Sequence, residues 1–165
     1  MTKLGAETAS STDEIATGLE KFAAVAETVG LSYEYATSAL AAVTAETRQS
    51  ADVVGTAFKT IFARVEGLKL GETLEDGTTY NQYSEALLAV GVDIKEANGE
   101  LKDMDQILKE MAGVWATLNR DEQVALAQKV AGIRQYNQLM SLMNNWDVVE
   151  ENLSRAYGAT GELDS

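Results

Sequence analysis

The sequence predicts an all-α fold, a compact bundle of six to eight short helices. Apolar residues recur at helical spacing in one segment after another, and Ser, Thr, Asp or Asn precedes most of these segments while Gly or Asn follows them. The 165 residues include 13 glycines and no proline, so we expect glycine, together with Asn, Asp and Ser, to interrupt the helices. A hydrophobic content of 45% is typical of a globular protein. A chain of this length can bury roughly 70% of its unfolded surface.

The helical domain is expected at residues 11–157. Residues 1–10 are small and polar without any period, which predicts a disordered leader. Gly158 and Gly161 predict a flexible tail at residues 158–165.

The first helix is expected to begin after Ser11. Ser11 and Glu14 have the spacing of a capping box, in which each side chain accepts a hydrogen bond from the backbone of the other residue. Gly30 is expected to end this helix. Its apolar stripe comprises Ile15, Leu19, Phe22, Ala26 and Val29.

The chain is organised around two further helices between residues 31 and 65. Ser32 and Ser50 are their expected N-caps, with Asp52 in the first turn of the second helix. The first apolar stripe comprises Tyr33, Ala36, Leu40 and Val43, and the second comprises Val54, Phe58, Ile61 and Val65. Because each helix can bury only one face, we expect an antiparallel or angled pair.

Residues 67–79, with the sequence GLKLGETLEDGTT, interrupt the helical pattern. They include three glycines and have no sustained apolar period, so we expect a loop. Two arrangements remain open. The chain forms one compact domain, or this loop joins two loosely coupled helical lobes at residues 11–66 and 80–157.

A short helix is expected after the loop. Thr79 is its expected N-cap, Gln82 lies at the capping-box position, and Gly91 is the expected end. The buried side comprises Tyr83, Leu87 and Val90.

The one β element that the sequence suggests is a small hairpin near residues 92–103. Residues 92–95 alternate between apolar and polar side chains, Asn98-Gly99 is a strong tight-turn pair, and residues 100–102 could return. Two strands alone are marginally stable, so this hairpin must pack against helices if it forms.

The rest of the chain predicts four helical stretches. Asp103 with Gln106 opens the first, and Asn119 with Glu122 opens the second, which ends at Gly132. At Gly132 we expect a bend or the close approach of another backbone. In order, the stripes are Ile107, Leu108, Met111, Val114, Trp115 and Leu118; Val124, Ala127, Val130 and Ala131; Tyr136, Leu139, Met140, Met143 and Trp146; and Val149, Leu153, Ala156 and Tyr157.

Charge and hydropathy argue against two classes of partner. The 13 basic and 26 acidic residues give a net charge of -13, so a surface that binds nucleic-acid phosphates is not expected. No apolar run approaches the roughly 18 residues needed to cross a bilayer, and the N-terminal residues lack the regions of a signal peptide. The acidity is typical of a solvated surface, and an acidic docking patch is the alternative.

The sequence predicts no enzyme, no cofactor and no metal site. Cys and His are both absent, which removes disulfides, the commonest zinc ligands and the commonest general base. The sequence contains no Ser-x-x-Lys pair, nucleophile elbow or phosphate-binding glycine loop. Residues 93–100 also lack the evenly placed acids of a calcium loop.

Paired acids are the best remaining candidates for chemistry. Asp103 with Asp105, or Glu72 with Glu75 and Asp76, could supply a carboxylate pair for glycoside cleavage or a weak site for a hard cation. The alternative is a helix cap for the first pair and solvation of the loop for the second group. We expect the alternative, because carboxylates at helix starts accept hydrogen bonds from free backbone N–H groups.

Aromatic and methionine side chains could line a ligand groove or a partner site. The candidates are Trp115, Trp146, Met140 and Met143, and their helical spacing favours the core instead. A second group cannot all be buried on one stripe, so we expect one or two of its members to be exposed. This group comprises Tyr33, Tyr35, Tyr80 and Tyr83.

Three motifs occur in a fixed order along the first half of the chain. A helix opens at Gly30-Leu31-Ser32, the next helix carries Gly-Thr-Ala-Phe-Lys-Thr at residues 55–60, and Arg64 lies near its end. In this order they resemble the core region of phage tail tape measure proteins. The stretches at residues 90–111 and 123–146 add to the resemblance, which covers most of residues 12–157.

The resemblance implies a structural role in a virion. Tape measure proteins set tail length during phage assembly, lie inside the tail tube and leave with or ahead of the DNA during ejection. The implied partners are the tail tube protein, tail assembly chaperones and other tape measure copies, and the protein would be made in the bacterial host cytoplasm. From the charge and hydropathy of the sequence we expect no direct contact of this segment with nucleic acid or membrane.

Glycine and cap residues interrupt the helices repeatedly, so we expect a folded module of a much longer chain rather than a continuous rod. Two other functions remain open at this point. One is a domain that hydrolyses cell wall or accompanies such a hydrolase, and the other is a bacterial helical adaptor.

Overall fold

The computed structural model describes residues 12–164, and the side chains of residues 12–155. Helices make up 72% of the chain, and the described part contains eight helices and no strand or sheet, which confirms the all-α prediction. In order they are α2 (Thr12–Val29), α3 (Tyr33–Thr47), α4 (Ala51–Lys69), α5 (Tyr80–Leu88), α6 (Met104–Trp115), α7 (Arg120–Ala131), α8 (Tyr136–Asn144) and α9 (Trp146–Asp164).

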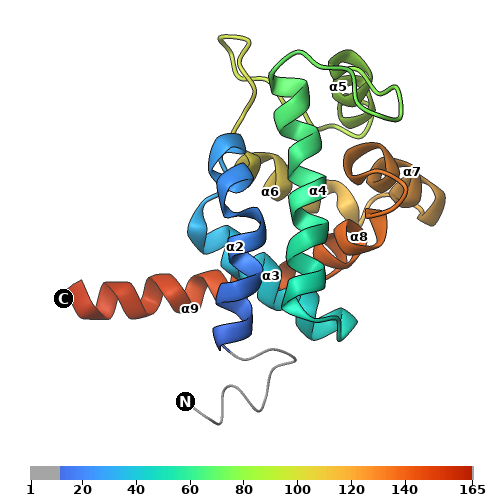
Figure 1. The fold of residues 1–165 in the computed structure, drawn as a ribbon. Coiled ribbons are helices and arrows are strands. Elements are labelled where there is room, and N and C mark those ends of the chain that lie inside the picture. Colours follow the sequence, from blue (N-terminus) through green and yellow to red (C-terminus); the bar gives the residue numbers. More distant parts are fainter. Residues whose placement is uncertain (1–11, 165) are drawn as a thin grey trace.

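Helix α4 occupies the middle of the molecule, with α2 and α3 on one side and α7 and α8 on the other (Figure 1). The predicted stripe of α4 is buried throughout. Phe58 packs edge-on against Phe22 of α2, with 5.4 Å between ring centroids, and Phe62 completes this aromatic cluster. Tyr33 is wrongly placed on the stripe of α3, because its side chain is 69% exposed.

Helices α2 and α4 cross with their backbones in contact. A Cβ atom on Gly55 would collide with the carbonyl oxygen of Gly18, and a Cβ atom on Gly18 would collide with the carbonyl oxygen of Ala51. Small residues allow two helix backbones to approach this closely. The crossing therefore fixes α2 against the central helix.

The predicted N-caps are confirmed at four helices. The side chains of Ser32 and Ser50 accept hydrogen bonds from backbone N–H groups three residues later, at 3.2 and 3.1 Å. Thr79 and Asn119 form complete capping boxes with Gln82 and Glu122. The Ser11 cap lies outside the described residues.

The hairpin at residues 92–103 is not formed. The chain does reverse at Gly99 (φ 88°), but the two arms share only an isolated antiparallel bridge between Lys95 and Leu101. The pairing does not extend towards the turn, because the backbone N–H of Glu100 donates to the side chain of Asn98 at 3.0 Å instead of to the facing arm. Such local bonds compete with strand pairing.

Several helix ends differ from the prediction. Helix α4 continues through Gly67 to Lys69, so the connecting loop begins at Leu70. Helix α5 ends at Leu88, three residues before Gly91. Helix α9 runs past Gly158 and Gly161 to Asp164 and projects away from the body of the molecule (Figure 1). Three helices, α2, α4 and α9, have 18 or 19 residues and are longer than the short helices expected.

Buried residues on both sides of the loop belong to one hydrophobic cluster, which includes Leu19 of α2 and Leu153 of α9. The boundaries of the helical domain and the division into two lobes remain predictions.

Candidate functional site

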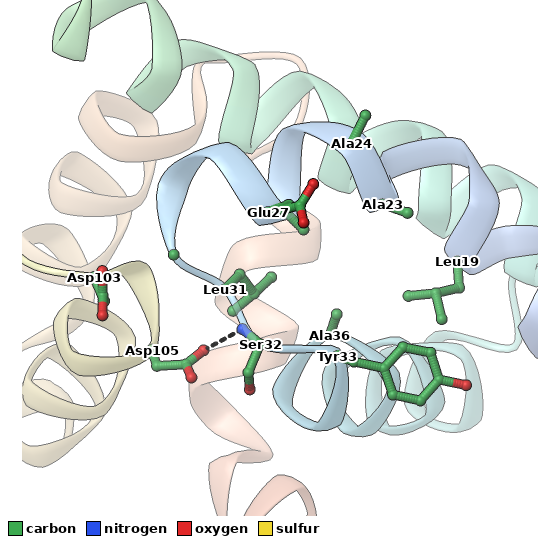
Figure 2. A pocket seen from close by; sticks show the side chains of 12 residues that line it. Leu19, Ala23, Ala24, Glu27, Leu31, Ser32, Tyr33, Ala36, Asp103 and Asp105 are labelled. Carbon is green, nitrogen blue, oxygen red and sulfur yellow. Dashed lines mark hydrogen bonds between the residues drawn. The ribbon is translucent and has the colours of Figure 1, made fainter.

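An open groove lies where α2, the start of α3 and the start of α6 meet (Figure 2). Its volume is about 660 Å³. We call it the α2–α6 groove. Its lining includes small and apolar side chains together with three acids, namely Leu19, Ala23, Ala24, Leu31, Tyr33, Ala36, Glu27, Asp103 and Asp105. The groove therefore contains one of the two acid groups that the sequence singled out.

Asp105 ties α6 to the junction between α2 and α3. Its carboxylate accepts a hydrogen bond of 2.9 Å from the backbone N–H of Ser32, and its own backbone N–H donates to the carbonyl oxygen of Gly30 at 3.2 Å. Burial raises the pKa of Asp105, and the charges of Asp103 and Glu34 raise it further, against the lowering effect of the Ser32 hydrogen bonds. The Asp105 carboxylate thus accepts its hydrogen bond from the backbone at the N-terminus of α3, although Asp105 lies in the first turn of α6.

Asp103 occupies the N-cap position of α6, but its side chain accepts no capping hydrogen bond. The prediction that this carboxylate caps the helix is wrong. Asp103 instead lies against Gly30, whose φ of 77° and missing Cβ leave room for it, since an added Cβ would lie 2.8 Å from the carboxyl carbon of Asp103. Its carboxylate stays exposed at the groove.

The loop acids do not join this site. Glu72 and Glu75 are exposed, as expected for solvation of the loop. Asp76 accepts a hydrogen bond from the backbone N–H of Thr78 at 3.0 Å and pairs with Arg64 at 3.2 Å. Burial alone would raise the pKa of Asp76, but the Thr78 hydrogen bonds and the Arg64 charge hold it below the usual value.

Arg64 of α4 contacts both the end of α7 and Asp76 of the connecting loop, and so joins three parts of the chain. These contacts were not predicted from the sequence. The Nε and Nη2 atoms of Arg64 donate to the carbonyl oxygens of Val130 and Lys129 at 3.1 and 2.7 Å, and so cap the C-terminal end of α7. A Cβ atom on Gly132 would lie 3.2 Å from Nη1 of Arg64, so the close neighbour expected at this glycine is a side chain rather than a backbone. A weak signal was present, because Arg64 lies between the buried residues Phe62 and Val65 and is the one arginine of α4.

The large side chains of α6, α8 and α9 belong to the core, as their spacing predicted. Trp115, Met140, Met143 and Trp146 are all buried. The indole N–H of Trp115 donates to Asn144 at 2.7 Å, and the ring of Trp146 stacks on Tyr35 with 5.9 Å between centroids. Among the tyrosine group, Tyr33 is exposed, Tyr83 is buried, and Tyr35 and Tyr80 are half-buried.

The charged side chains that line the α2–α6 groove belong to Glu27, Asp103 and Asp105. No lysine or arginine lines it in the described part of the chain, and its charged groups are all carboxylates. The best-placed of these, Asp105, is already engaged with Ser32. Between residues 12 and 155, no group of three or more acids lies close enough together to hold a metal ion.

The helices that the structure describes include none that is long and apolar enough to cross a membrane.

Comparison with known proteins identifies a family and no structural neighbour. A family model described as phage-related minor tail protein matches residues 1–132. No solved structure matches the chain.

Proposed function

The chain belongs to the family of phage-related minor tail proteins, and from this premise we propose that it is the folded helical module of a tail tape measure protein. A tail structural role follows from the family. The finer proposal is that the module takes part in tail assembly and length determination, and that the full-length protein acts in DNA ejection.

The observation that carries this proposal is the place of the three tape-measure-like motifs in the fold. Gly55, in the second motif, forms the crossing of α2 and α4. Gly30, in the first motif, forms the turn that receives Asp103, and Arg64 binds the end of α7. Each of the three motifs therefore contributes a residue that joins helices to one another.

The compact fold limits how this segment could contribute to length. A continuous helix extends about 1.5 Å per residue, so the longest helices here, of 19 residues, span about 28 Å. We infer that the segment acts as a docking or assembly module, and that length is measured by other parts of a longer protein.

The proposed partners are the tail tube protein, tail assembly chaperones and other copies of the protein, and the proposed location is inside the tail tube. The test is an in-frame deletion of residues 12–155 from the full-length protein in a phage that carries it. We expect absent or abnormal tails and loss of co-purification with tail tube subunits. Tails of normal length and infectivity would contradict the proposal.

A carboxylate-based hydrolase is the second candidate. One observation favours it, namely the raised pKa of Asp105 beside Asp103 in an open groove, because a general acid needs a raised pKa. Its test is release of peptidoglycan fragments by the purified protein and by an Asp103→Asn/Asp105→Asn variant. Release that the variant loses would support a hydrolase, and no release would exclude it.

A further inference from the structure

The acids of the α2–α6 groove have no cationic partner. Four ion pairs occur among the described side chains, and none involves Glu27, Asp103 or the neighbouring Glu34. Lys69 contacts α2 at the carbonyl oxygen of Thr28, but it does not line the groove. Carboxylates held beside apolar surface are favourable positions for a cation from outside.

The two ends of the groove also differ in chemistry, because one end is acidic and the other is apolar and aromatic. Figure 2 shows Asp103 and Asp105 at one end and Leu19 and Tyr33 at the other. The ring of Tyr33 is 69% exposed although it lies beside the buried core of α3. An exposed tyrosine ring offers apolar area and a face that attracts cations. A matching ligand therefore has an apolar group at one end and a positive charge at the other.

We propose that the α2–α6 groove binds a short segment of another tail protein in which one or two apolar side chains lie next to lysine or arginine. Charge complementarity favours this occupant over a second copy, because two chains of net charge -13 repel each other. The apolar side chains would lie against Leu19, Tyr33 and Ala36, and the cations would lie against Glu27 and Asp103.

The test is a titration of the purified full chain, followed by NMR, with a short blocked peptide that carries two leucines followed by two lysines. Peptides in which glutamate replaces lysine, or serine replaces leucine, are the ligand controls. We expect the leucine-lysine peptide alone to shift the backbone resonances of Ala24, Ser32 and Tyr33.

Matched double variants distinguish binding at the groove from attraction by the net charge of the protein. Glu27→Gln/Asp103→Asn removes two exposed groove acids, and Glu85→Gln/Asp121→Asn removes two exposed acids on α5 and α7. The groove variant should weaken binding about threefold to tenfold, and the control by less than about twofold. Tyr33→Ala should weaken binding without any change of charge.

Equal binding to both double variants would overturn the proposal, because it would show attraction by net charge alone. A dimer in sedimentation that the groove variant abolishes would also overturn it, because a second copy would then be the occupant. The inference rests on the proposed tail function, but the two can fail separately. The titration tests the groove, and the deletion of residues 12–155 tests the role in tails.

Discussion

Gly18 of α2 and Gly55 of α4 lie backbone against backbone, at a point where neither residue has room for a side chain. About one turn further along each of the two helices, the rings of Phe22 and Phe58 meet edge-on. The crossing and the aromatic contact together position α2 on the central helix. Because α2 forms one wall of the α2–α6 groove, this wall depends on two glycines that do not themselves line the groove.

Gly55→Ala should destabilise the protein. The added methyl group must push α2 away from α4, and overpacking of this kind costs about 1–3 kcal/mol. Gly113→Ala on α6 is the matched control, because a Cβ there meets nothing within 4 Å. In that exposed helical position, alanine should raise the free energy of unfolding by about 0.5–1 kcal/mol. Urea unfolding followed by circular dichroism measures both, and equal effects would contradict the crossing.

Arg64→Lys should lower the free energy of unfolding by about 1–3 kcal/mol. Lysine cannot reach both carbonyl oxygens of α7 with a planar fork, so at least one loses its hydrogen bond. Asp76→Asn, which removes only the ion pair at the partly exposed carboxylate, should cost less than about 1 kcal/mol. The measurement is chemical denaturation, and a larger loss for Asp76→Asn would show that the ion pair dominates.

Asp105→Asn should leave the protein as stable as before, or more stable, at neutral pH. Folding raises the pKa of Asp105 above its usual 3.8, so its ionised form weakens the folded state at neutral pH. That penalty disappears as the pH falls through the raised pKa towards 3.8. Asparagine keeps an oxygen that can accept from Ser32. The difference between wild type and variant should therefore shrink in acid.

Asp76→Asn should show the opposite sign. The pKa of Asp76 is lowered, so its ionised form stabilises the folded state at neutral pH, and this contribution is lost as the pH falls below 3.8. Denaturation curves for both variants across the acid range check the signs. A fall in stability for Asp105→Asn at neutral pH would show that its charge, and not only its oxygen, holds Ser32.

Tyr83→Phe should not destabilise the protein. The hydroxyl of Tyr83 is buried and has no hydrogen-bond partner among the described residues, and burial raises its pKa above the usual value. Removal of an unsatisfied polar group should be neutral or stabilising by up to about 1 kcal/mol. Leu87→Ala on the same helix is the control and should cost about 2–5 kcal/mol. A clear loss for Tyr83→Phe would reveal a partner for the hydroxyl.

The helices and their N-caps could be predicted from the sequence because their signals are local. Ser32, Ser50, Thr79 and Asn119 each bond to a residue three positions away, and the stripe of α4 follows from helical spacing alone. The hairpin was predicted from local signals as well. The turn expected at Asn98-Gly99 does form, but the arms on either side of it share one isolated bridge instead of a ladder.

The candidate site could be predicted only in part, because it depends on contacts between distant residues. Asp103 and Asp105 were identified as a pair, but Ser32, which binds Asp105, lies 73 positions away in the sequence. The sequence around Ser32 and the sequence around Asp105 contain no pattern that predicts this contact. The same holds for Gly18 with Gly55 and for Arg64 with α7, since each needs the packing of whole helices first.

We propose a dependence of tail assembly on the module that the crossing of α2 and α4 builds. Its most direct test compares phages whose full-length protein carries Gly55→Leu, at the crossing, or Ala63→Leu, at an exposed position of the same helix. Electron micrographs and infectivity assays measure the result. We expect few or abnormal tails and low infectivity with Gly55→Leu, and normal tails with Ala63→Leu. Normal, infectious tails with Gly55→Leu would contradict the account.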